Sequence, residues 1–139
     1  MNRFVLDCSV TMAWCFEDEA DAYADAVLEA LAEGEALVPC IWTLEVANVL
    51  AVGERRKRLT PAQSTRFVEL LQSLPVSVED ESGRRPVAEI LSLARELTLS
   101  AYDASYLDLA ARTGLPLAMR DGGLATAAAR YGVPRFYPG

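Results

Sequence analysis

The sequence contains no histidine, and this absence excludes several common kinds of active site. Histidine is the usual general base near neutral pH and the commonest nitrogen ligand of a metal ion. A Ser–His–Asp triad is therefore impossible, and so are the familiar Cys/His zinc sites. Any catalytic chemistry has to rely on other side chains.

Cysteine is scarce as well: Cys8, Cys15 and Cys40 are an odd number and have no CxxC spacing. We interpret them as reduced thiols of a cytoplasmic protein. The first residues, M-N-R-F-V-L-D, reach a carboxylate too soon for a secretory signal. P-loop and Gly-rich dinucleotide motifs are also missing.

Long apolar runs are missing too, because the longest, residues 36–52, is interrupted by Pro39, Glu45 and Asn48. No membrane association is expected. The net charge of −7 argues mildly against a nucleic-acid partner, because phosphate binding depends on Lys and Arg. That argument weakens if the acids are concentrated in a metal site. Twelve of the 13 basic residues are arginine, the better bidentate phosphate ligand.

The 139 residues suit a single domain, 1–139, in which short apolar strands alternate with helices. We expect strands at 4–7, 36–40, 76–78, 116–119 and 135–137. Helices are expected at 9–14, 16–32, 43–56, 61–74, 86–97, 101–113 and 121–132. This alternation predicts an α/β fold: a parallel sheet of about five strands with helices on both faces and right-handed crossovers.

Several residues mark where these helices begin and end. T-P-A-Q, from Thr60 to Gln63, combines an N-cap, a proline in the first turn and a capping box. Ser9 and Asp121 are expected to cap the helices that follow them, and Gly34 to end the helix before it.

Four acids fall where such a sheet binds ligands, at the carboxyl ends of its strands. Asp7 ends the first strand, Glu45 lies early in the helix after the second, and Asp121 follows the fourth. Asp103 begins the helix that leads back into the fourth strand. We therefore expect all four carboxylates to meet at one edge of the sheet.

Each acid also has a simpler structural explanation. Asp7 and Asp121 could cap helices, and Asp103 could stabilise a helix N-terminus. Glu45 is harder to explain in this way, since W-T-L-E-V-A-N-V-L surrounds it with apolar residues. Two carboxylates 4 Å apart repel by about 4 kcal/mol at an effective dielectric constant of 20. Either some hold protons or a cation lies among them, and all-oxygen ligands suit Mg²⁺ or Mn²⁺.

Four segments, V-L-D-C-S, L-E-V-A-N-V-L, A-Y-D-A-S-Y-L-D-L-A and R-D-G-G-L-A, together resemble a PIN domain. The most similar members are the VapC-type ribonuclease toxins of VapBC toxin–antitoxin pairs. The resemblance implies a Rossmann-like layered fold and metal-dependent RNA cleavage. It assigns catalysis to Asp7, Glu45, Asp103 and Asp121, which together would hold one or two Mg²⁺ or Mn²⁺ ions. We count Asp7, Asp103 and Asp121 as the firmest metal ligands.

The resemblance places Ser9 where a small hydroxyl residue often lies near the metal. Met119 departs from the family, which often has Thr or Ser at that position. Asn48 could orient a ligand or be an amide at the edge of the core. The basic residues Arg55, Arg56, Lys57 and Arg58 could steer RNA, or could simply stabilise a helix C-terminus. Asp108 is expected to be a solvated helix acid.

A toxin of this family implies a VapB-like antitoxin protein as partner. The antitoxin would place a basic residue at the acidic edge and apolar residues between helices 43–56 and 61–74. Trp42 and Phe67 are candidate contacts or core residues. A homodimer or a toxin–antitoxin hetero-oligomer is expected. Two alternatives remain: an inactive PIN-like binding module, and an aspartyl-phosphate phosphatase, which needs a second acid where Ser9 stands.

Overall fold

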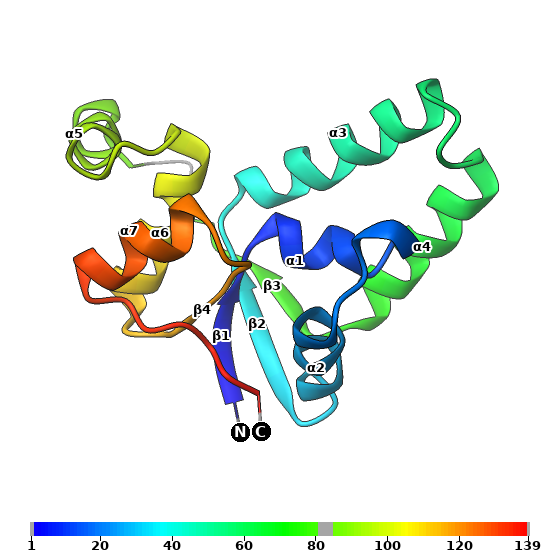
Figure 1. Cartoon of the computed structure of the whole chain (residues 1–139), viewed down its shortest axis with the longest axis horizontal. Coiled ribbons are helices and arrows are strands. Elements are labelled where there is room, and N and C mark those ends of the chain that lie inside the picture. The colour runs from blue at the N-terminus through cyan, green and yellow to red at the C-terminus, as the bar shows by residue number, and fades with distance from the viewer. Residues whose placement is uncertain (1, 81–84, 139) are drawn as a thin grey trace.

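A computed structural model describes residues 2–80 and 85–138 and has an α/β architecture (Figure 1). The strands are β1 (Asn2–Leu6), β2 (Gly34–Val38), β3 (Val76–Val78) and β4 (Leu117–Ala118). The helices are α1 (Cys8–Ala13), the 3₁₀ helix η1 (Glu17–Glu19), α2 (Ala22–Ala30), α3 (Ile41–Arg55), α4 (Pro61–Ser73), α5 (Val87–Leu97), α6 (Ala101–Thr113) and α7 (Gly123–Tyr131). The α/β class predicted from the sequence is confirmed.

All strand pairs are parallel, and the sheet has the order β3-β2-β1-β4. The carboxyl ends of the strands therefore share one edge. The fifth strand expected at 135–137 is wrong: the structure has an isolated bridge between Leu117 and Arg135 instead. Pro134 and Pro138 flank this segment, and because proline has no N–H group they limit how far a ladder can extend.

Helices cover the two faces of the sheet unequally (Figure 1). On one side α6 packs on β1 and β4, and α5 packs on α6 and stands away from the sheet. On the other side α1 contacts α2 and α3, while α3 and α4 form a projecting helical hairpin. In the described part of the chain no helix has the length and apolarity needed to cross a bilayer.

The first helices differ from the expected boundaries. The cap of α1 is Asp7, whose side chain accepts a hydrogen bond from the Ser9 backbone N–H, so the prediction of Ser9 as the cap is wrong. The single helix expected at 16–32 is divided into η1 and α2. Ala20 is extended, and the Asp21 side chain accepts the N–H of Ala24 as the cap of α2. An aspartate side chain can accept backbone N–H groups as an N-cap. This favours a new helix beginning at that residue over one helix continuing through it.

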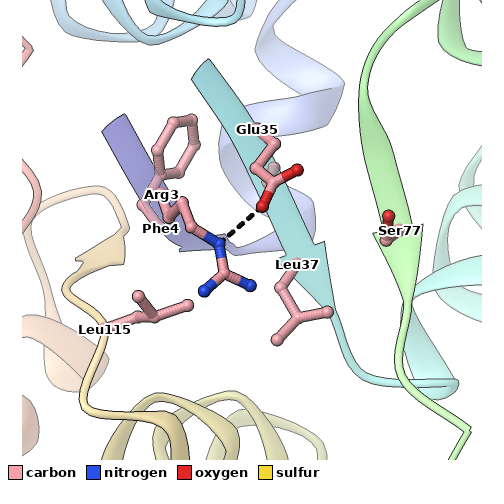
Figure 2. A pocket seen from close by; sticks show the side chains of 7 residues that line it. Arg3, Phe4, Glu35, Leu37, Ser77 and Leu115 are labelled. Carbon is pink, nitrogen blue, oxygen red and sulfur yellow. Dashed lines mark hydrogen bonds and ion pairs between the residues drawn. The ribbon is translucent and has the colours of Figure 1, made fainter. Parts of the chain in front are cut away.

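Gly34 begins β2 and does not end the preceding helix, so that prediction is wrong. A Cβ at this position would lie 2.5 Å from the backbone oxygen of Asn2, so only glycine allows β2 to approach β1 here. One residue further on, Arg3 Nε of β1 bonds Glu35 Oε1 of β2 at 2.5 Å (Figure 2). The cavity beside this pair has a volume of about 30 Å³. It lies at the amino ends of the strands, opposite the edge expected to bind ligands.

Two further features of the helices bear on the sequence analysis. The capping box is confirmed, because Thr60 and Gln63 bond each other's backbone N–H at the start of α4. Asp108 is not a solvated acid: its side chain is 13% exposed and pairs with Arg85 and Arg112. Arg85 lies just before α5 and Arg112 lies in the last turn of α6, so Asp108 links α6 to the segment that leads into α5.

Leu107 provides a test of the packing between α6 and the sheet. It is fully buried, whereas Leu44 of α3 is 66% exposed. We expect Leu107→Ala to lower the free energy of unfolding by about 2–5 kcal/mol through lost burial and a residual cavity. Leu44→Ala should change it by less than about 1 kcal/mol. Urea unfolding of the two variants measures the difference, and equal losses would contradict this packing.

Candidate active site

Three acids come together at the carboxyl edge of the sheet, each carried by a different element. Asp7 follows the last residue of β1, Glu45 lies in the second turn of α3, and Asp103 lies in the first turn of α6. The Asp7 carboxylate is close enough to those of Asp103 and Glu45 for their charges to raise its pKa. Residues separated by as many as 96 positions therefore meet because parallel strands end at one edge.

Asp7 is the most buried of the three, with 7% of its surface exposed. Its Oδ2 accepts hydrogen bonds from the Ser9 hydroxyl and, at 3.3 Å, from the Ser9 backbone N–H. Burial raises the pKa of Asp7 to about 6, against the opposing effect of the Ser9 bonds. The charges of Asp103 and Glu45 add to that increase. The carboxylate is thus held in place, but its negative charge is not compensated.

Glu45 is half-buried, and its carboxylate is held by a tyrosine. Tyr106 Oη of α6 donates a hydrogen bond of 2.6 Å to Glu45 Oε1. Burial raises the pKa of Glu45, the Tyr106 hydrogen bond opposes that increase, and the charge of Asp103 adds to it. Burial and the Glu45 charge raise the pKa of Tyr106 as well, so its hydroxyl remains a hydrogen-bond donor.

Asp103 is placed by the start of α6. Ser100 caps this helix by accepting the Asp103 backbone N–H at 3.0 Å, and burial raises the pKa of the Asp103 carboxyl. Within residues 2–80 and 85–138, none of the three acids forms an ion pair. Three neighbouring carboxylates without basic partners are the defining feature of this site.

Asp121, the fourth expected acid, has a different environment. Its side chain is 93% exposed, and Oδ1 accepts a 2.9 Å hydrogen bond from Arg135 Nη1. Asp121 does not cap α7, whose N-cap is Gly122, so that prediction is wrong. Arg135 also donates through Nε to the Met119 carbonyl at 2.9 Å. Arg135 thus links the backbone of Met119 to the side chain of Asp121.

The donor set of the three acids suits a hard divalent cation in charge and in chemistry. Its members are oxygen ligands. The charges of Asp103 and Glu45 raise the pKa of Asp7, the charge of Asp103 raises the pKa of Glu45, and a cation between them would relieve that repulsion. The three carboxylates are neighbours, but they do not form a complete metal-binding site. Among the residues that the structure describes, no three acidic or cysteine side chains are grouped closely enough to hold a metal ion as they stand.

The remaining predicted site residues lie around these acids or away from them. Ser9 binds Asp7 directly, and Asn48 is exposed one turn beyond Glu45. In the basic cluster, Arg55, Arg56 and Lys57 are exposed at the end of α3. Arg58 instead pairs with Asp18 and Glu19 and lies 4.1 Å above the Phe16 ring.

Sequence reasoning missed Tyr106 and Arg135. The helical periodicity of α6 marks Tyr106 as a core residue, and it is indeed fully buried. The available signal was chemical: a buried tyrosine hydroxyl needs a hydrogen-bond partner. Arg135 stacks 4.0 Å from the Tyr23 ring and pairs with Asp121. No local sequence pattern predicts either contact of Arg135.

An apolar groove of about 380 Å³ lies between α3 and α4. Its walls include Trp42, Val46 and Leu50 of α3 and Val68 and Leu71 of α4, with Val76 of β3 at its end. Trp42 is 8% exposed, and its indole N–H donates to Thr11 Oγ1 at 3.0 Å. Phe67, the other expected contact, is buried in the core.

Comparisons with known proteins agree with this architecture. The family model described as PIN domain matches residues 4–130. The crystal structure of PAE2754 from Pyrobaculum aerophilum is 24% identical, with a TM-score of 0.68 over 91% of this chain and 84% of that one. The crystal structure of FitAcB from Neisseria gonorrhoeae is 21% identical, with a TM-score of 0.64 over 97% of each chain. No curated protein matches the sequence.

The raised pKa of Asp7 predicts how stability depends on pH in the absence of divalent ions. Asp7 is ionised above a pKa of 3.8 in the unfolded chain and above about 6 in the folded one. Its contribution to stability is therefore fully present below pH 3.8 and is lost as the pH rises to 6. The difference corresponds to about 3 kcal/mol.

Asp7→Asn should remove this effect, because the amide can still accept the Ser9 hydrogen bonds without carrying charge. In EDTA, we expect the variant to be more stable than the wild type by up to about 3 kcal/mol at pH 7.5. The two proteins should be nearly equal at pH 3.5. Urea unfolding at both pH values measures this, and an unchanged difference between them would disprove the burial of an uncompensated charge.

Proposed function

Because the chain belongs to the PIN domain family, we propose that it is a metal-dependent endoribonuclease that hydrolyses phosphodiester bonds of RNA. The observation that carries this proposal is the cluster of Asp7, Glu45 and Asp103. They are neighbouring carboxylates from three segments. Burial raises the pKa values of all three, and charge repulsion adds to the increase at Asp7 and Glu45. Such an arrangement is unfavourable for folding, so we take it to have been retained for its chemistry.

In this proposal each residue of the site has a specific role. Asp7, Glu45 and Asp103 hold Mg²⁺ or Mn²⁺, and Ser9 orients the Asp7 carboxylate through its hydroxyl and backbone N–H. A bound ion would supply positive charge to the phosphate and lower the pKa of an attacking water. Asp121 would take part through Oδ2, because the pair with Arg135 occupies only Oδ1.

The exposed Arg55, Arg56 and Lys57 are proposed to contact RNA away from the bond that is cleaved. Ten residues of helix separate Glu45 from Arg55, a distance of about 15 Å along α3. These cations would therefore bind phosphates a few nucleotides from the site and strengthen binding in a salt-dependent way. Arg58 is already paired with Asp18 and Glu19 and contributes less.

We also propose that the protein is the toxin of a toxin–antitoxin pair and that a VapB-like antitoxin occupies the groove between α3 and α4. Apolar side chains line this groove, and the chain carries a net charge of −7. A small partner with an apolar helix and a basic residue would match both properties. The basic residue could neutralise the acids that otherwise bind the metal. Homodimers or hetero-oligomers of the pair are expected, and an RNA substrate would place the protein in the cytoplasm.

The nuclease proposal predicts a metal requirement and a dependence on the clustered acids. Purified protein incubated with single-stranded RNA should cleave it with Mg²⁺ or Mn²⁺ and not with EDTA. Asp7→Asn and Asp103→Asn should each lower the rate at least about 100-fold, because each removes a charged ligand of the site. Gel analysis of the RNA over time measures the rates.

Asp108→Asn is the matched control, since Asp108 lies on the same helix as Asp103 but pairs with Arg85 and Arg112. Its cleavage rate should stay within about threefold of the wild type at a temperature where it is folded. Equal cleavage by wild type and Asp7→Asn would refute the proposal. Absence of Mg²⁺ binding together with binding of a partner peptide would instead favour a PIN-like binding module.

The groove proposal predicts that a charge at its wall blocks the partner. Val68 lines the groove and is 38% exposed, whereas Val87 is 82% exposed on α5. We expect Val68→Glu to weaken binding of the antitoxin at least about 10-fold, because a carboxylate must lose water to enter an apolar contact. Val87→Glu should bind normally. Co-expression with a VapB-like antitoxin candidate, sought among the genes beside this one, followed by calorimetry, tests this, and equal binding by both variants would contradict it.

A further inference from the structure

Tyr106 has the only side-chain hydroxyl that the described structure shows bonded to Glu45. The tyrosine is fully buried in the core, and its Oη reaches from α6 to α3, where it lies 2.6 Å from Glu45 Oε1. The two residues are 61 positions apart, so the bond joins separate elements. A buried tyrosine that needed any hydrogen-bond acceptor could have used a backbone carbonyl, as Tyr23 does with Phe136.

The position of Tyr106 on its helix adds to this argument. Asp103 and Tyr106 are three residues apart on α6, so they lie on the same face. One helix therefore contributes an acid of the site and also the donor that holds the acid of α3. The hydrogen bond uses Oε1 of Glu45 and leaves Oε2 able to accept another ligand.

We propose that Tyr106 is a positioning residue that holds the Glu45 carboxylate toward Asp7 and Asp103 so that the three can bind a divalent cation. This inference rests on the proposed nuclease function but concerns a residue outside the four acids. Tyr106 touches neither substrate nor ion. It restricts the rotation of the Glu45 side chain, which would otherwise turn away from two neighbouring carboxylates of like charge.

The test is the affinity of the full chain for Mn²⁺, measured by calorimetry without RNA. Tyr106→Phe keeps the ring and loses the hydroxyl, and we expect it to bind Mn²⁺ about 10-fold more weakly than the wild type. Thr113→Val is the matched control, because it also removes one hydroxyl hydrogen bond, of 2.7 Å, from α6 but lies ten residues beyond Asp103. That variant should bind Mn²⁺ like the wild type even if its melting temperature falls.

A second pair of variants separates positioning from a general effect on packing. In a Glu45→Ala background, Tyr106→Phe should change the Mn²⁺ affinity no further, because the carboxylate that it positions is gone. Wild-type affinity in Tyr106→Phe, or an equal loss in both backgrounds, would overturn the inference. If the wild type and Asp7→Asn both fail to bind Mn²⁺, the metal-dependent function fails and this inference fails with it.

Discussion

The repulsion among three neighbouring carboxylates, one buried and two half-buried, is the constraint on which the site depends. Parallel strands end at one edge, so β1, and the helices that follow β2 and precede β4, bring Asp7, Glu45 and Asp103 to one place. Burial removes water from these charges, and their proximity makes Asp7 and Glu45 harder to ionise. A fold selected for stability alone would place apolar or paired residues here.

Several other acids differ from the three clustered acids because they form ion pairs with arginine. Asp18, Asp21, Asp108 and Glu79 each pair with an arginine, and Arg112 binds Glu79 through two nitrogens at 2.9 Å. Arg112 lies on α6, and Arg58, Arg85 and Arg120 lie in connecting segments. Within the described chain none of them forms an ion pair with the three clustered acids. Hydroxyls hold the clustered acids instead: Ser9 holds Asp7, and Tyr106 holds Glu45. Neutral donors fix a carboxylate in place and leave its charge available for a cation.

Much of the fold followed from the sequence, because alternating apolar runs and strong caps such as Thr60 act locally. The meeting of Asp7, Glu45 and Asp103 was also predictable, since it depends on strand order and not on side-chain detail. The features that the sequence did not predict depend on competition between alternative local structures or on contacts between residues that are distant in the sequence. Asp21 divided an expected helix, and Pro134 and Pro138 limited an expected strand. The pairing of Asp121 depends on Arg135, whose position is set only when the C-terminal segment folds against β4.

The groove and the acids share their structural support. Trp42 lines the groove and donates to Thr11 Oγ1, and the Thr11 hydroxyl donates to the backbone oxygen of Asp7 at 3.3 Å. On the same helix, α3, Glu45 follows Trp42 by three residues and is held by Tyr106. A partner that shifted α3 would therefore act on Asp7 through α1 and on Glu45 through the helix itself. The same packing that brings the carboxylates together links them to the surface where an antitoxin is expected to bind.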